Sequence, residues 1–280
     1  DVPLLSQDAQ FAHRLARPLP EARVPDKRWA DATLQQWTLP FLDQLLAKMA
    51  PKGSVPGRSG MTYAIMRAAP RQFRLAYVDL FNAMQDHWLV PPALGLGLIS
   101  PLRKVRNKPG LADARPVTLL ECPIKLFTKG LNDRAQECLA GFHRTHGRHI
   151  LSRLQFGFLR NSTCQHALWP VLTALEDAHR HGKEIHMLSV DQKRAYDSVE
   201  FWSLELALRR LHFPEGFVQL MRELDEAAQS AVRLPQGESR FFSLERGVRQ
   251  GDSLSPLRYI LWMDQILREW DGGCDPYEFG

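Results

Sequence analysis

The chain has 280 residues, 44% of them hydrophobic, which is ordinary for one large globular domain or two smaller ones. Its formal net charge of +5 fits a phosphate-rich partner but does not establish one. No apolar run reaches the length of a membrane span and no secretory leader is visible, so we expect no association with a membrane. The first residue is Asp rather than Met, so we expect a piece of a longer product.

The spacing of apolar residues in the first half predicts helices around a pair of strands. Residues 1–55 carry no motif, although 33–49 have a helical pattern. Apolar residues recur at three- and four-residue steps over 73–88, which predicts a helix with one apolar stripe. The stretch 96–120 places apolar runs on either side of a basic loop, which predicts two strands joined by a turn.

The second half adds further helices and one strand. Helical patterns cover 123–140 and 164–180, and another helix is expected after the motif at 190–199. Alternate side chains of 185–191 share one face, which predicts a strand. A last helix is predicted to begin at Pro256, because proline suits the first helical position. This mixture of strands and helices indicates an α+β fold.

The segment VDQKRAYDSV, residues 190–199, carries the sharpest chemical signal. Asp191 ends the predicted strand, and a strand end is a rigid support for a metal-binding carboxylate. Hard oxygen ligands suit Mg²⁺, which also bridges to substrate phosphates. For Asp191 alone, a metal ligand and a turn residue are equally plausible interpretations. Asp197 is better explained as a helix cap, with Glu200 three residues later completing a capping box.

Two further segments are suggestive but weak on their own. In RGVRQGDSLSP, residues 246–256, two glycines bracket Val-Arg-Gln and would let the backbone approach a nucleotide closely. Glycine-rich turns before helices are nevertheless common. The basic loop contains Arg103, Lys104, Arg106 and Lys108, and Arg115 follows it. Such side chains can stabilise charge on a triphosphate, although a lone charged run is usually a solvated loop.

Five segments, in this order, resemble motifs of reverse transcriptases, most closely those of non-LTR (LINE-type) retrotransposons. They are ARPVTLLECPIKLFTK from Ala114, QFGFLRNSTCQHAL from Gln155, DQKRAYDSV from Asp191, LHFPEGFVQLMREL from Leu211 and AVRLPQGESRFFSLERGVRQGDSLSP from Ala231. The resemblance is specific because the motifs agree in order and spacing. One departure is Asn161, which stands where the family usually has glycine.

The resemblance implies the fingers and palm of a right-hand polymerase. Residues 1–55 would be an N-terminal extension of unknown role, 56–184 a fingers-like region and 185–280 a partial palm. The family's aromatic-x-Asp-Asp motif, which supplies the second metal-binding carboxylates, should follow the last helix. The final DGGCDPYEFG does not match it. We therefore expect an incomplete palm, no thumb, and nucleic-acid binding without polymerisation by this chain alone.

The resemblance also implies roles for individual residues. Asp191 would be the catalytic carboxylate and first metal ligand, with the carbonyl of Gln192 beside it. The metal would be Mg²⁺, or alternatively Mn²⁺. Tyr196 would lie under the sugar and reject a 2′-hydroxyl by its bulk. Gln250 and Gly251 would line the nucleotide pocket.

The incoming triphosphate would be held by Arg115, with Lys104 as a less certain helper because the basic loop can be aligned in more than one way. The partners implied are an RNA template, a DNA primer and deoxynucleoside triphosphates. The reaction implied is attack of the primer 3′-hydroxyl on the α-phosphorus, with two metal ions clamping the attacking and leaving oxygens.

Two alternatives stay open at this point. An RNA-dependent RNA polymerase also has two Asp residues in this palm motif, but the bulky Tyr196 and the pair Gln250–Gly251 favour DNA synthesis. A degenerate or domesticated remnant that binds nucleic acid without catalysis is compatible with the same residues. The triplet His143, His146 and His149 matches no usual zinc-ligand spacing, so we interpret it as part of a surface loop near template phosphates.

Overall fold

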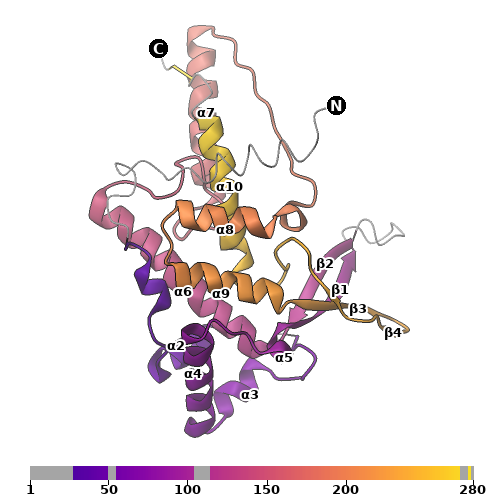
Figure 1. The fold of residues 1–280 in the computed structure, drawn as a ribbon. Coiled ribbons are helices and arrows are strands. Elements are labelled where there is room, and N and C mark those ends of the chain that lie inside the picture. Colours follow the sequence, from indigo (N-terminus) through magenta and orange to yellow (C-terminus); the bar gives the residue numbers. More distant parts are fainter. Residues whose placement is uncertain (1–27, 50–54, 104–113, 272–276, 279–280) are drawn as a thin grey trace.

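The computed structural model describes residues 28–49, 55–103, 114–271 and 277–278, and it shows a largely helical body with a small sheet at one side (Figure 1). In chain order its elements are η1 (Asp31–Leu34), α2 (Leu39–Lys48), α3 (Tyr63–Ala68), α4 (Arg71–Asp86), α5 (Pro92–Gly95), β1 (Leu96–Arg103), β2 (Ala114–Leu120), α6 (Cys122–His146), α7 (Cys164–His181), η3 (Ala195–Ser198), α8 (Phe201–Arg210), α9 (Glu215–Glu226), β3 (Gln229–Leu234), β4 (Gly237–Glu238), β5 (Phe242–Ser243) and α10 (Ser255–Asp271). The architecture is mixed α/β and is compatible with a fingers and palm fold. None of the described helices is long and apolar enough to cross a membrane.

The sheet is small and mixed, with the order β2-β1-β3-β4 and with β5 also paired to β3. Strands β1 and β2 are antiparallel, and Ile99 lies opposite Thr118. Strand β3 runs parallel to β1, so segments more than a hundred residues apart in sequence share one sheet. The predicted pair of strands is therefore confirmed. Most of the basic loop, including Lys104, lies outside the described residues.

The helices pack around one hydrophobic core, and α6 is its central element. The indole of Trp37 stacks on Phe127 of α6 with 5.5 Å between the ring centroids. Gly130 makes this contact possible, since a β-carbon there would lie 2.1 Å from the Trp37 ring. Burial of large apolar side chains of this kind contributes most of the stability of such a body.

The helical predictions agree with the structure to within a few residues. The helix predicted over 73–88 is α4, those over 123–140 and 164–180 are α6 and α7, and the last helix is α10. The helix α6 extends to His146, so the prediction that the histidine segment is a loop was wrong for its first two histidines. The periodicity of apolar residues continues through Phe142, which is buried.

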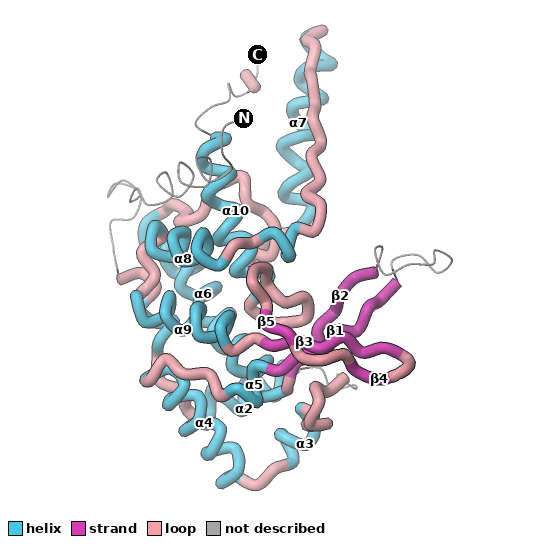
Figure 2. The backbone as a smooth tube through the Cα atoms, turned by 45° about the vertical axis from the view of Figure 1, so that its right-hand side comes forward, coloured by secondary structure: helices cyan, strands magenta, loops and turns pink. Residues whose placement is uncertain are grey.

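The strand predicted over 185–191 is absent. This segment leads from the end of α7 back to the body as an exposed stretch without regular structure, and together with α7 it projects from the body (Figure 2). The side chain of Leu188 is 82% exposed. A strand needs a neighbour to satisfy its backbone N–H and C=O groups, and no described strand lies beside this one.

The capping role predicted for Asp197 was also wrong. Asp197 lies within the 3₁₀ helix η3, and α8 begins after Glu200 without a side-chain cap. The turn is organised instead by Arg194, which adopts a left-handed conformation with φ of 52°. Its carbonyl accepts hydrogen bonds from the amides of Asp197 and Ser198 at 2.9 and 3.1 Å.

Candidate functional site

The glycine-containing loop before α10 joins two distant parts of the chain. The amide of Val248 donates to the carbonyl of Tyr196 at 2.9 Å, and the amide of Gly247 donates to the carbonyl of Val199 at 2.7 Å. Two residues later, the carbonyl of Gln250 accepts a hydrogen bond of 2.6 Å from the amide of Thr118 on β2. The loop therefore holds the Tyr196 turn and the edge of β2 in one place.

Glycine is required at position 251 because the loop passes very close to strand β2. Its φ of +113° is a conformation that residues with a side chain rarely adopt, and a β-carbon there would lie 2.6 Å from the carbonyl oxygen of Thr118. Sequence reasoning expected close approach of this backbone to a ligand. The structure shows that Gly251 also approaches the protein's own strand β2.

Polar side chains of the loop bond to the body of the protein and hold the loop in place. Asp252 accepts a hydrogen bond of 2.5 Å from the hydroxyl of Thr128 on α6. Arg249 turns inward and donates to the carbonyl of Gly95 at 2.7 Å, and burial lowers the pKa of its guanidinium. Because a buried guanidinium without partners is costly, this bond favours one conformation of the loop.

A buried ion pair adjoins this set. The guanidinium of Arg258, on α10, bonds to the carboxylate of Asp225 at the end of α9. Burial raises the pKa of Asp225, and the charge of Arg258 opposes that rise. Sequence reasoning did not find this pair, because the two residues come from segments whose contact is not visible in a linear pattern.

The oxygens expected to bind a metal are unengaged within the described part of the chain. The exposed carboxylate of Asp191 accepts no hydrogen bond from a described residue, and neither does the backbone carbonyl of Gln192. The side chain of Gln192 is held separately, accepting from the hydroxyl of Tyr259 at 2.7 Å and donating to Ser198 at 3.0 Å. Two free hard oxygens on a restrained segment fit a cation such as Mg²⁺.

Tyr259 lies at the centre of this group, although sequence reasoning did not single it out. Its ring is 5.4 Å from that of Tyr196, measured between centroids. The pKa of Tyr259 is raised, mainly by burial and secondarily by the negative charge of Asp191. The pKa of Tyr196 is raised too, first by burial and then by Tyr259. In the sequence, the only signal for Tyr259 was its place in the first turns of the helix predicted to begin at Pro256.

Of the remaining predicted residues, Arg115 and Gln250 lie on or near the contact between the loop and β2. Arg115 is exposed on β2, three residues before Thr118, or about 10 Å along the strand. It forms no ion pair with any described residue. Gln250 is half-buried, and its side-chain amide makes no hydrogen bond within the described ranges. Lys104 lies outside the described residues.

The histidine triplet is not arranged as a metal site. The rings of His143 and His149 stack with 3.9 Å between centroids and 11° between planes. His146 packs instead on Phe142, 4.4 Å away. Within the described part of the chain, no group of three or more His, Cys, Asp or Glu side chains is arranged to hold a metal ion.

Comparison with known proteins gives consistent matches. The family model described as "Reverse transcriptase (RNA-dependent DNA polymerase)" matches residues 106–278, more than half of the chain. The chain is 24% identical over 255 residues to the "Retrovirus-related Pol polyprotein from type-2 retrotransposable element R2DM" of Drosophila melanogaster, covering 91% of this chain and 23% of that protein.

Two other relatives give similar coverage. The "Probable RNA-directed DNA polymerase from transposon X-element" of Drosophila melanogaster is 28% identical, over 74% of this chain and 22% of that protein. A "Retrovirus-related Pol polyprotein from type-1 retrotransposable element R2" of Nasonia vitripennis is 26% identical, over 81% of this chain and 21% of that protein. The chain thus spans less than a quarter of the length of each of these three relatives.

Proposed function

The chain belongs to the reverse transcriptase (RNA-dependent DNA polymerase) family, and from this premise we propose that it forms one side of a site for RNA-templated DNA synthesis. The membership predicted from the sequence motifs, in the non-LTR retrotransposon class, is confirmed. The family description also favours DNA synthesis over RNA synthesis and over a non-catalytic remnant. The activity, substrates and partners of the whole protein are part of the proposal.

One observation carries the proposal: the loop with Gln250 is bonded to both the Tyr196 turn and strand β2. A polymerase must present the metal ligand, the sugar contact and the triphosphate contact to a single nucleotide, so these segments have to converge. Hydrogen bonds at Val248 and Thr118 hold them together within the protein itself. Preorganisation of this kind lowers the cost of reaching the reactive geometry.

The metal would be held by the carboxylate of Asp191 and the carbonyl of Gln192. A bound Mg²⁺ or Mn²⁺ would supply a polarising charge at the reacting phosphate. Tyr259 and Ser198 hydrogen-bond to the side chain of Gln192 and so restrain the segment that carries those two oxygens. The left-handed conformation of Arg194 then turns the chain into η3. A single carboxylate fixes a cation poorly, so we expect a second carboxylate motif to complete the site.

The nucleotide contacts follow from the same arrangement. Tyr196 would present its ring to the sugar and exclude a 2′-hydroxyl. Gln250 and Gly251 would line the pocket beside it, and Arg115 would reach the triphosphate from β2, assisted by Lys104. On an RNA template, the DNA primer would present the 3′-hydroxyl that attacks the α-phosphorus, and pyrophosphate would leave. The guanidinium of Arg115, which is exposed and has no ion-pair partner among the described residues, is suited to a bidentate phosphate contact.

We propose a fingers-like role for 56–184 and a partial palm for 185–280, with 1–55 as an extension. The two regions share the sheet, because β1 comes from the first and β3 from the second. We therefore treat them as functional regions of one body. The hydrogen bond from Thr118 to Gln250 joins β2, which carries Arg115, to the loop of the second region.

The test is a matched pair of carboxylate variants six residues apart. We expect Asp191→Asn to abolish primer extension on an RNA template in an enzyme that contains this chain and a second carboxylate motif. Asp197→Asn removes a carboxylate that is also exposed, and it should retain most of the activity. Extension that survives Asp191→Asn, or that is lost equally in both variants, would overturn the assignment of Asp191.

A further inference from the structure

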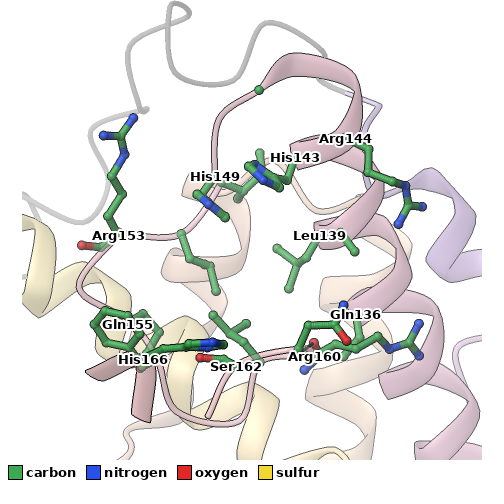
Figure 3. A pocket seen from close by; sticks show the side chains of 18 residues that line it. Gln136, Leu139, His143, Arg144, His149, Arg153, Gln155, Arg160, Ser162 and His166 are labelled. Carbon is green, nitrogen blue, oxygen red and sulfur yellow. Dashed lines mark hydrogen bonds between the residues drawn. The ribbon is translucent and has the colours of Figure 1, made fainter. Parts of the chain in front are cut away.

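The structure contains a cavity that is lined by none of the residues of the proposed polymerisation site. It has a volume of about 710 Å³ and is bounded by the C-terminal half of α6 and the loop 147–162 that follows it (Figure 3). Helix α6 places its nearest lining residue, Gln136, fourteen positions after Cys122, or about 21 Å along the helix from β2. Pockets of this size accommodate organic ligands, whose usual range is roughly 300–1,000 Å³.

The loop that walls the cavity is anchored to α10. The buried carboxylate of Asp264 accepts a hydrogen bond of 2.5 Å from the amide of Ser152. Arg268 bonds both to Asp264, at 2.5 Å, and to the carbonyl of Ile150. Both loop residues line the cavity, so this wall is held in place.

The same loop is anchored a second time to α6. The side chain of Gln136 accepts from the amide of Arg160 at 3.1 Å and donates to the carbonyl of Phe158 at 2.8 Å. Asn161 has a φ of 65°, a left-handed conformation in which asparagine is the best tolerated residue after glycine. This explains why Asn161 can stand at the position usually held by glycine. The cavity is therefore a formed feature rather than a gap beneath a loose loop.

The cavity combines an apolar floor with a cationic and aromatic rim. The floor includes Leu139 and Leu159, and the rim carries three histidines and three arginines: His143, His149, His166, Arg144, Arg153 and Arg160. No Asp or Glu is among the described residues that line it. Figure 3 shows the stacked His143 and His149 rings on one side and Ser162 with the His166 ring on the other.

The charge of this rim is only partly compensated. Glu137, outside the cavity, pairs with both Arg144 and Arg160 at 2.6 Å. Arg153 makes no hydrogen bond or ion pair with any described residue. Burial, followed by the nearby charges of His143 and Arg153, lowers the pKa of His149. The stacked imidazoles therefore offer flat rings beside the guanidinium of Arg153, which has no partner among the described residues.

We propose that this cavity binds one nucleotide unit of a single-stranded RNA, with its base against the apolar floor and histidine rings and its phosphate at Arg153. Stacking of unpaired bases on planar side chains, combined with arginine contacts to phosphate, is how proteins hold single strands. The proposal rests on the proposed function, because the RNA-directed polymerase supplies the strand. It places on that strand a contact made by residues other than those proposed to hold the reacting nucleotide.

The test measures binding of a fluorescent single-stranded RNA dodecamer to the full chain across a salt series. We expect the double variant His149→Ala/Arg153→Ala to bind on the order of tenfold more weakly than the unsubstituted chain. Arg153→Ala alone should reduce the slope of log Kd against log salt by about 0.7, the value for one phosphate contact on a single strand. His146→Ala is the matched control, since His146 is close to His149 in sequence but ends α6, packs on Phe142 and does not line the cavity.

Three outcomes would overturn the proposal. The double variant and His146→Ala could bind RNA equally well, crosslinks from 4-thiouridine in the dodecamer could map away from loop 147–162, or free uridine triphosphate could compete as strongly as the strand. The last result would indicate a mononucleotide site. Circular dichroism of each variant separates lost binding from lost folding.

The proposed function has a separate readout. If extension depends on Asp191 while the cavity variants bind normally, only the cavity proposal fails. If the cavity variants lose RNA binding while extension is independent of Asp191, only the polymerase assignment fails.

Discussion

The hydroxyl of Tyr259 donates a hydrogen bond to the side-chain oxygen of Gln192, with 2.7 Å between the two oxygens. Tyr259 belongs to α10, and Gln192 is the neighbour of Asp191. A side chain of the last helix thus restrains the segment that carries the proposed metal ligand. Because 183–192 has no strand partner among the described elements, this contact is one of few that fix its position.

We predict that Tyr259→Phe raises the Mg²⁺ concentration needed for half-maximal primer extension by roughly threefold to tenfold, since a lost hydrogen bond of this kind is worth about 1 kcal/mol. Titrating extension against Mg²⁺ measures this. Tyr63→Phe is the control, because the buried Tyr63 hydroxyl has no hydrogen-bond partner among the described residues. An equal shift in both variants would show that Tyr259 acts through stability alone.

We predict that Tyr196→Ala admits ribonucleotides. The half-buried ring, packed against Tyr259, would stand where the 2′ position of the sugar passes, so removing it opens space without removing a reacting group. The ratio of deoxynucleotide to ribonucleotide incorporation should fall by about tenfold or more, as expected when a pocket loses steric exclusion. Tyr196→Phe keeps the ring and should keep the discrimination. Unchanged selectivity in Tyr196→Ala would make the residue a packing element.

We predict that Gly251→Ala lowers both thermal stability and nucleotide use. The added β-carbon would meet the Thr118 carbonyl at 2.6 Å, and the backbone is already at φ of +113°. Strain of this kind costs on the order of 1–3 kcal/mol. Gly60→Ala is the matched control, with φ of +75° and nothing within 4 Å of a β-carbon. Comparable melting temperatures for the two variants would argue against the steric clash with β2.

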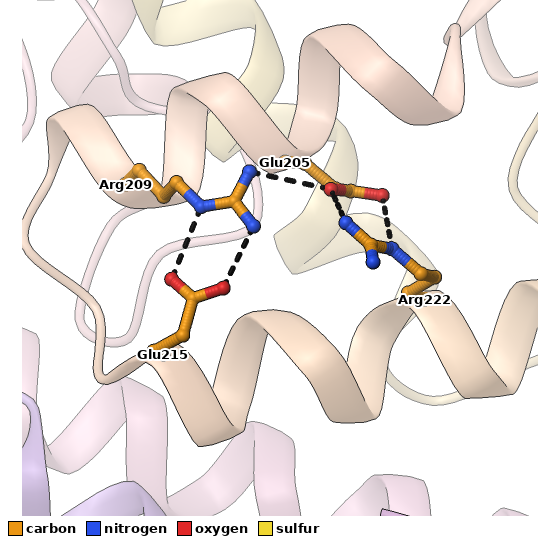
Figure 4. Close-up of polar contacts among 4 residues, drawn as sticks. All are labelled: Glu205, Arg209, Glu215 and Arg222. Atoms are coloured by element: carbon orange, nitrogen blue, oxygen red, sulfur yellow. Dashed lines mark hydrogen bonds and ion pairs between the residues drawn. The ribbon is translucent and has the colours of Figure 1, made fainter.

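The ion-pair network between α8 and α9 predicts a dependence of stability on pH (Figure 4). Glu205 bonds to Arg222 at 2.5 and 3.0 Å and lies 3.3 Å from Arg209, which in turn pairs with Glu215 at 2.7 Å. The hydrogen bond to Arg222 is the largest cause that lowers the pKa of Glu205 below 4.5. The folded state therefore holds the ionised form more strongly than the unfolded state does.

Because the pKa of Glu205 is lower in the folded protein than in the unfolded chain, its ionised form stabilises the fold at pH values above the unfolded-state pKa. This stabilisation is lost as the pH falls through the folded-state pKa. We expect the free energy of unfolding to decline as pH falls from about 5 to about 3, and Glu205→Gln to flatten this decline by about 1 kcal/mol or less, because solvent screens the network. Urea titrations at several pH values measure it. Glu238→Gln, whose carboxylate lies 3.6 Å from Arg233, should change the slope less.

Local features of the fold were readable from the sequence because they depend on short-range chemistry. Apolar residues at helical spacing predicted α4, α6 and α7, and the runs flanking the basic loop predicted β1 and β2. The strand at 185–191 was not correctly predicted. The alternation of side chains along the segment shows only that one of its faces could be buried, whereas a strand forms only where a neighbouring strand pairs with it. The capping role of Asp197 failed for a related reason: a positive φ at Arg194 displaced the start of the helix.

The sequence by itself determined the family and the types of residue in the candidate site, since order and spacing of motifs such as RGVRQGDSLSP are properties of the linear chain. Only the tertiary structure decided which of these residues meet. The bonds from Val248 to Tyr196 and from Thr118 to Gln250 each join segments about fifty or more residues apart. Tyr259 and the cavity beside α6 emerged for the same reason, because a contact across the fold depends on how packed helices orient their side chains, and no local pattern records that orientation.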